Sequence, residues 1–199
     1  MNTECNTPLQ ATAEAATDAR GPALLALARA AISTALGQPM AADASAAWLQ
    51  DPGACFVTLT QAGQLRGCIG SLQARRSLLA DVKANAVAAA LQDPRFAPLG
   101  LAELPHTEIE VSVLSPMQPL AFTDEADALA HLRPGVDGVV FGYKAYRSTF
   151  LPQVWEQLPD RLDFMAHLKQ KAGLPPHFWA PGVRLQCYTV TKFKEGTLS

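Results

Sequence analysis

The stretch LRGCIGSL, residues 65–72, decides the fold that we expect for this chain. Alternation of its side chains predicts a β-strand with one apolar face and a second face that carries Arg66 beside Cys68. Gly67 and Gly70 interrupt the strand, and glycine weakens a strand unless another group must approach its backbone closely. Because a neighbouring cation favours the thiolate form of cysteine, the stretch predicts a site in which Arg66 activates Cys68 beside the gap left by Gly70.

The residues before this stretch predict the partner strand of a β-hairpin. Residues 55–60 are rich in β-branched and aromatic side chains, and residues 61–63 end in the glycine that closes a three-residue loop. With that loop, Thr58 would face Arg66 across the hairpin. The apolar side chains of both strands would then share the face that packs on the core: Val57, Leu59, Leu65 and Ile69.

The composition predicts a globular, cytoplasmic protein. The chain has 199 residues, of which 49% are hydrophobic, and this is enough to bury a sizeable core. Sixteen Lys and Arg residues against eighteen Asp and Glu give a net charge of −2, which favours neither a nucleic acid nor a membrane as partner. The four cysteines lack the spacing of a zinc site, so we expect reduced thiols and neither a metal nor a cofactor.

Helices and strands alternate along the chain in an order that predicts an α+β fold. We expect helices at 22–36, 77–91, 123–132 and 160–172, hairpins at 55–72 and 136–151, and strands at 107–114 and 183–193. The last three helices would be capped by Ser77, by Thr123 or Asp124, and by Asp160. Because most strands are joined by hairpins, the predicted fold is a mostly antiparallel sheet with flanking helices, arranged as two intertwined αββαβ halves.

LRGCIG at residues 65–70 resembles the signature of the AMMECR family. Further matching motifs follow in the family's order: FVT at 56–58, DPRF at 93–96, VSVL at 111–114, TFLPQV at 149–154 and KAGL at 171–174. The resemblance covers about residues 22–193 and implies a two-part α+β fold in which the signature lines a cleft. Bacterial and archaeal members are named as protein A of the AmmeMemoRadiSam system, which implies a Memo-like protein and a radical-SAM enzyme as partners.

We expect the chain to be divided accordingly. Residues 1–20 show no apolar periodicity and predict a disordered tail, and residues 196–199 predict a second tail. Between them, residues 21–195 would form a single AMMECR-type domain. Two subdomains, at about 21–116 and 117–195, would form its cleft.

Two functions of different classes follow from these observations. In the first, a thiol-dependent enzyme or enzyme subunit uses Cys68 and Arg66 as catalytic residues on a small anionic substrate. In the second, a non-catalytic module binds a ligand or a partner protein in the same glycine-rich cleft. The candidate ligand-binding residues are Gly67, Gly70, Ser71, Arg95, Arg147 and Thr149.

Structural explanations compete with each of these assignments. Cys68 can be a small buried hydrophobe with Arg66 held in an ion pair, because free cysteine is among the most buried residue types. Asp93 is expected to end its helix, and Arg95 either pairs with it or lies over the site. On the second hairpin, Arg147 and Thr149 share a face, as Arg66 and Cys68 do on the first.

Overall fold

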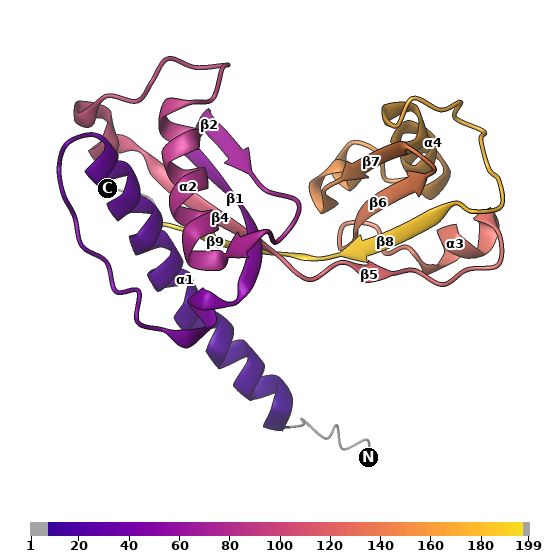
Figure 1. Ribbon diagram of the computed structural model, residues 1–199, viewed down its shortest axis with the longest axis horizontal. Helices are drawn as coiled ribbons and strands as arrows, with labels where there is room; N and C mark the ends of the chain where they lie inside the picture. The colour runs from indigo at the N-terminus through magenta and orange to yellow at the C-terminus, as the bar shows by residue number, and fades with distance from the viewer. Residues whose placement is uncertain (1–7, 197–199) are drawn as a thin grey trace. The chain divides into compact units, whose positions relative to one another are not determined.

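The computed structural model describes residues 8–196, which form two compact units (Figure 1). The first unit contains the chain up to Val113 together with the residues from Lys192 onward, and the second is Leu114–Thr191. Each unit has its own antiparallel sheet and its own hydrophobic core, so the α+β class is confirmed. Among residues 8–196, no helix combines the length and the apolarity needed to cross a bilayer.

Helix α1 (Pro8–Ala35) is longer than the sequence pattern predicts. We expected a disordered tail up to residue 20 and a helix beginning at Pro22, but the helix begins at Pro8 and continues through Pro22. Residues 8–20 lack the apolar periodicity of an amphipathic helix, but they are rich in alanine, the strongest helix former. Residues 1–7 of the predicted tail lie outside the described residues.

The sheet of the first unit has the strand order β2-β1-β4-β9, with β3 paired to β1. Its strands are β1 (Pro52–Gln61), β2 (Gln64–Gly70), β3 (Arg76–Ser77), β4 (Glu108–Leu114) and β9 (Val190–Lys194). Helix α2 (Leu78–Leu91) begins at the predicted cap, where the Ser77 hydroxyl accepts the Ala80 amide. Helix α2 packs on β1, and α1 packs on α2, which encloses the core of this unit.

The turn between β1 and β2 is shorter than we predicted. Gln61 pairs with Gln64, so the loop is the two-residue turn Ala62-Gly63 and not a three-residue loop. Both turn residues have positive φ, 47° and 74°, as tight hairpin turns require. Alanine is unusual in that conformation, so the residues Ala62-Gly63 do not predict a two-residue turn.

The shorter turn changes the register of the signature strand. Thr58 pairs with Cys68 and not with Arg66. Leu59 pairs with Gly67 and Thr60 with Leu65, so Arg66 is the extra, unpaired residue of a β-bulge in β2. The two-residue turn pairs Leu65 with Thr60, so Leu65 lies off the core face and is 43% exposed. The other predicted core residues of the hairpin, Val57, Leu59 and Ile69, do pack in the core cluster.

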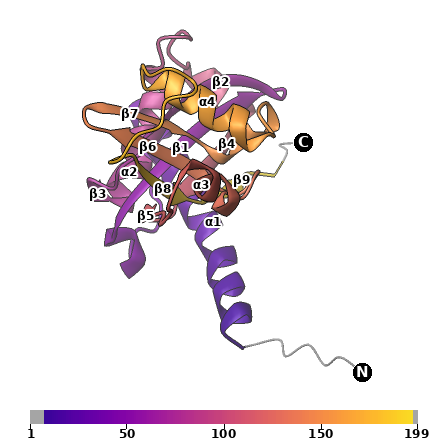
Figure 2. The ribbon, with the colours of Figure 1, turned by 90° about the vertical axis from the view of Figure 1, so that its right-hand side faces the viewer.

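The second unit contains a four-stranded sheet of order β5-β8-β6-β7. Its strands are β5 (Gln118–Pro119), β6 (Gly138–Tyr143), β7 (Tyr146–Phe150) and β8 (Arg184–Tyr188), so the predicted strand 183–193 divides into β8 here and β9 in the first unit. Figures 1 and 2 show helices α3 (Glu125–His131) and α4 (Arg161–Lys171) on the same face of this sheet. The opposite face of the sheet is not covered by these helices.

Capping carboxylates begin both helices of this unit, as predicted. Asp124 accepts the Asp127 amide at 2.9 Å, and Asp160 accepts two amides of the first turn of α4. Short 3-10 helices complete the two units: η1 (Ala47–Gln50), η2 (Leu101–His106) and η3 (Pro152–Glu156).

Candidate functional site

Cys68 lies on β2, the edge strand of the first sheet, and its side chain is half-buried. The register opposite Thr58 brings the Thr58 hydroxyl oxygen to 3.3 Å from the Cys68 sulfur. Cys68 is a free thiol, as are the two other cysteines that the structure describes. The site therefore has a partly accessible sulfur with a hydroxyl group beside it.

The DPRF motif folds back onto the signature strand and binds both backbone groups of Cys68. The Cys68 amide donates to Asp93 Oδ2 at 2.9 Å, and Arg95 Nη2 donates to the Cys68 carbonyl oxygen at 3.3 Å. Asp93 and Arg95 are themselves paired, with Nη2 2.7 Å from Oδ2. Two motifs that are distant in the sequence thus meet at one residue.

Each member of this pair shifts the pKa of the other. The hydrogen bond from Arg95 holds the pKa of the Asp93 carboxyl far below its usual range, against the opposing effect of burial, and the Cys68 amide lowers it further. The pKa of the Arg95 guanidinium is raised, first by its hydrogen bond to Asp93 and to a smaller degree by the charge of a Cys68 thiolate. Asp93 is buried, whereas the Arg95 side chain is 54% exposed, so the cation is the accessible member of the pair.

Arg66 points to a different partner. Its guanidinium donates to both carboxylate oxygens of Glu103, at 3.1 and 3.3 Å, and to the Ala97 carbonyl at 2.9 Å. Glu103 has a lowered pKa, first because the Gly100 amide donates to it and then because Arg66 does. Arg66 is therefore held in a structural ion pair, the alternative that the sequence left open, and the guanidinium that these contacts bring to Cys68 is that of Arg95.

Both glycines of the signature have packing roles. A Cβ on Gly67 would lie 2.2 Å from the carbonyl oxygen of Ala89 on α2, so this position lets the helix approach the strand. A Cβ on Gly70 would lie 2.2 Å from the ring of Phe56, which pairs with it across the hairpin. Protein atoms thus occupy the space beside each glycine, and their role in ligand binding stays a prediction.

Ser71 belongs to a separate polar cluster beneath α2. Its hydroxyl donates to Asp81 at 2.8 Å, and the other oxygen of Asp81 accepts the Cys55 amide at 2.9 Å. Burial, and then the charge of Asp81, raises the pKa of the Cys55 thiol. Cys55 is therefore an inert core residue, and Ser71 contacts this cluster and not the Cys68 site.

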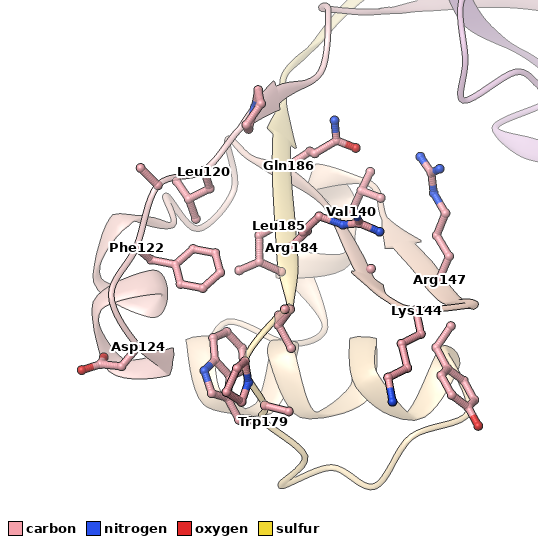
Figure 3. Close-up of a pocket in the computed structure, with 18 of the residues that line it drawn as sticks. Leu120, Phe122, Asp124, Val140, Lys144, Arg147, Trp179, Arg184, Leu185 and Gln186 are labelled. Carbon is pink, nitrogen blue, oxygen red and sulfur yellow. The ribbon is translucent and has the colours of Figure 1, made fainter.

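The second unit contains a cavity of about 1030 Å³ (Figure 3). Arg147 lines it and Thr149 does not; the Thr149 hydroxyl lies 3.2 Å from the Tyr188 hydroxyl. Figure 3 shows the side chains of Arg147 and Arg184 on one side of β8, and those of Phe122 and Trp179 on the other. The sequence did not predict Arg184 as a site residue, because its strand contains no motif and only the strand order brings it near Arg147.

Among residues 20–196, whose side chains the structure describes, no group of three His, Cys, Asp or Glu side chains could hold a metal ion. The sequence also missed the contact between Asp93 and the Cys68 amide. The DPRF motif was the available signal, but its meeting with LRGCIG depends on the way in which the chain turns after α2.

Comparison with known proteins gives consistent matches. The model of the AMMECR1 family matches residues 25–193. Protein MJ0810 of Methanocaldococcus jannaschii is 37% identical over 145 residues, which cover 71% of this chain and 72% of that protein. Protein Mbar_A1807 of Methanosarcina barkeri is 34% identical over 188 residues, covering 90% of this chain and 92% of its own length. The crystal structure of PH0010, an uncharacterized protein of Pyrococcus horikoshii, has a TM-score of 0.75 and 30% identity, and it covers 89% of this chain and 92% of its own.

Proposed function

Since this chain belongs to the AMMECR1 family, we propose that it works through Cys68, as a thiol-dependent enzyme or enzyme subunit that takes a small anionic substrate. One observation carries the proposal. The two motifs LRGCIG and DPRF meet at Cys68, where the Asp93–Arg95 pair fixes both backbone groups of the residue. A residue whose only task was to fill the core would not need this arrangement.

The chemistry of the site suits a positioned sulfur nucleophile. Cys68 is half-buried and not sealed, so a substrate can reach it. The exposed Arg95 guanidinium offers donors to an anionic group, although Asp93 offsets part of its charge. Thr58 can donate its hydroxyl hydrogen to the sulfur and so stabilise a thiolate. Arg95 thus replaces Arg66 as the proposed cation of the site.

The family resemblance extends the proposal to partners. We include a Memo-like protein and a radical-SAM enzyme as the proteins with which this chain would exchange its substrate or product. Cytoplasmic location is part of the same proposal, because free thiols persist in a reducing compartment.

A second function is favoured by a different observation. Arg66 is paired with Glu103 and so is not free to activate Cys68. This pairing favours a non-catalytic module that binds a ligand or a partner protein in the same glycine-rich cleft.

Alkylation of each cysteine with iodoacetamide, followed over pH by peptide mapping, separates the two functions. Cys187 is the internal reference, because burial raises the pKa of its thiol to about 11. We expect Cys68 to react more than about tenfold faster than Cys187 at pH 7, since thiolate fraction and access set the rate. Arg95→Gln should slow Cys68 several-fold, whereas the matched variant Arg75→Gln, at another exposed arginine of the first unit, should not. If Cys68 reacts no faster than Cys187, the thiol mechanism is wrong and the binding module remains.

A further inference from the structure

Three strands of the second unit bring two arginines to one level of the sheet. Gly142 on β6 pairs with Arg147 on β7 and with Arg184 on β8. Directly paired residues of antiparallel strands project to the same face, so both arginines flank Gly142. Because neighbouring strands are spaced by about 4.8 Å, the two Cα atoms lie about 10 Å apart, within reach of convergent guanidinium groups.

This is the face of the sheet opposite to α3 and α4. The residues that alternate with Gly142 and Arg184, namely Phe141, Tyr143 and Leu185, belong to or pack on the core beneath α3 and α4. Arg147 and Arg184 are exposed and line the cavity of about 1030 Å³, together with Val140 and Gln186. Their side chains therefore stand over an accessible hollow.

Gly142 forms an open floor between the arginines. A Cβ at this position would meet only the Arg184 carbonyl oxygen, at 3.9 Å, which is ordinary contact. Gly67 and Gly70 differ, because in both cases protein atoms fill the space that the missing side chain leaves. The glycine between the arginines thus leaves room that the protein does not use for its own packing.

Among the side chains that the structure describes, those of residues 20–196, neither guanidinium has an acidic partner. The arginine ion pairs of the structure involve Arg29, Arg66, Arg76, Arg95 and Arg133. Asp124 also lines the cavity, but its carboxylate caps α3 by accepting the Asp127 amide. Lys144 adds a third cation, whose ammonium lies over the Tyr143 ring. Like charges brought to one level without an acid repel each other, and a bound anion would remove that repulsion.

We propose that this face binds a phosphate-bearing organic molecule, with the phosphate held between Arg147 and Arg184 over Gly142. A dianionic phosphate matches two unpaired guanidinium groups in charge, and its oxygens accept the paired donors that arginine presents. The Gln186 amide is a further donor on the same face, and the cavity has room for the organic part of the ligand. This site is separate in the chain from Cys68 and does not rest on thiol chemistry.

Titration of the full-length protein with inorganic phosphate tests the proposal, followed by amide NMR against sodium chloride at matched ionic strength. We expect saturable shifts at the amides of Gly142, Arg147 and Arg184. Arg147→Gln and Arg184→Gln should each weaken binding about tenfold, as expected when charged hydrogen bonds to an anion are removed. Arg75→Gln removes the same charge from the first unit and should leave the affinity unchanged.

A second variant separates charge from shape. Gly142→Val keeps both arginines but fills the floor between them, so it should abolish the saturable shifts, and thermal melting checks that the unit stays folded. The proposal is overturned if sodium chloride reproduces the shifts or if Arg75→Gln weakens binding as much as Arg147→Gln does. Shifts confined to Cys68 and Arg95 would also overturn it, while supporting the proposed function of the first unit.

Discussion

The two hairpins of this chain place an arginine in the same local position and use it differently. Arg66 precedes Cys68 by two residues on β2, and Arg147 precedes Thr149 by two residues on β7. Arg66 lies at a bulge and is bound by Glu103, whereas Arg147 pairs in register with Gly142 and has no acidic partner in the described part of the chain. An arginine in this position thus has a structural role when a carboxylate pairs with it, and can bind a ligand when no carboxylate does.

The glycines of the two hairpins differ in the same way. Gly67 is required because the Ala89 carbonyl of α2 occupies the space where a side chain would be. A Cβ on Gly142 would make only an ordinary contact, with the Arg184 carbonyl oxygen at 3.9 Å. The comparison predicts that the same substitution destabilises the protein at Gly67 and has little effect at Gly142.

Gly67→Ala should produce the largest effect. Its Cβ would lie 2.2 Å from a helix carbonyl oxygen that cannot move alone, so β2 must shift from α2. We expect a loss of about 3 kcal/mol in the free energy of unfolding, the upper range for overpacking. The matched variant Gly142→Ala should change it by less than about 0.5 kcal/mol. Urea denaturation of both variants measures the difference, and equal losses would show that Gly142 is also a packing glycine.

Loss of the arginines themselves should give a smaller contrast. Arg66→Ala removes two hydrogen bonds to Glu103 and one to Ala97 from a side chain that is only 15% exposed. We expect it to cost about 1–2 kcal/mol of unfolding free energy. Arg147→Ala removes no acidic contact and should stay within about 0.5 kcal/mol of the parent. A destabilisation by Arg147→Ala as large as that by Arg66→Ala would mean that Arg147 also has a structural role.

Local signals in the sequence predicted much of this fold. The caps Ser77, Asp124 and Asp160 begin helices as expected, because a hydroxyl or carboxylate before an apolar run satisfies free amides locally. The α+β class followed from the same signals. The predicted start of helix α1, at Pro22, was too late, because the first turns of the helix are rich in alanine but show no apolar periodicity.

The candidate site was predicted less well, because it depends on register and on distant contacts. Recognising Cys68 and Arg95 required only the motifs, but choosing between Arg66 and Arg95 required the position of Glu103 and the two-residue turn at Ala62. The neighbourhood of Arg147 and Arg184 follows from strand order, which a hairpin pattern leaves undetermined. Errors of register change side-chain partners without changing the fold class.

The smallest expected effect is a dependence on pH that only the first hairpin should show. The pKa of Glu103 is lowered in the folded protein by the Gly100 amide and by Arg66, whereas an unfolded Glu titrates near about 4.3. The resulting stabilisation is fully present above that value and is lost as pH falls through the folded pKa. Because the carboxylate is partly exposed and screened, we expect the difference between parent and Glu103→Gln to be below about 1 kcal/mol at pH 7 and to vanish towards pH 2. Arg147→Gln, which breaks no carboxylate pair, should keep a constant difference from the parent over the same range. Urea melts from pH 7 to pH 2 measure both series, and a pH-dependent difference for Arg147→Gln would reveal an acidic partner for Arg147 and remove the contrast between the hairpins.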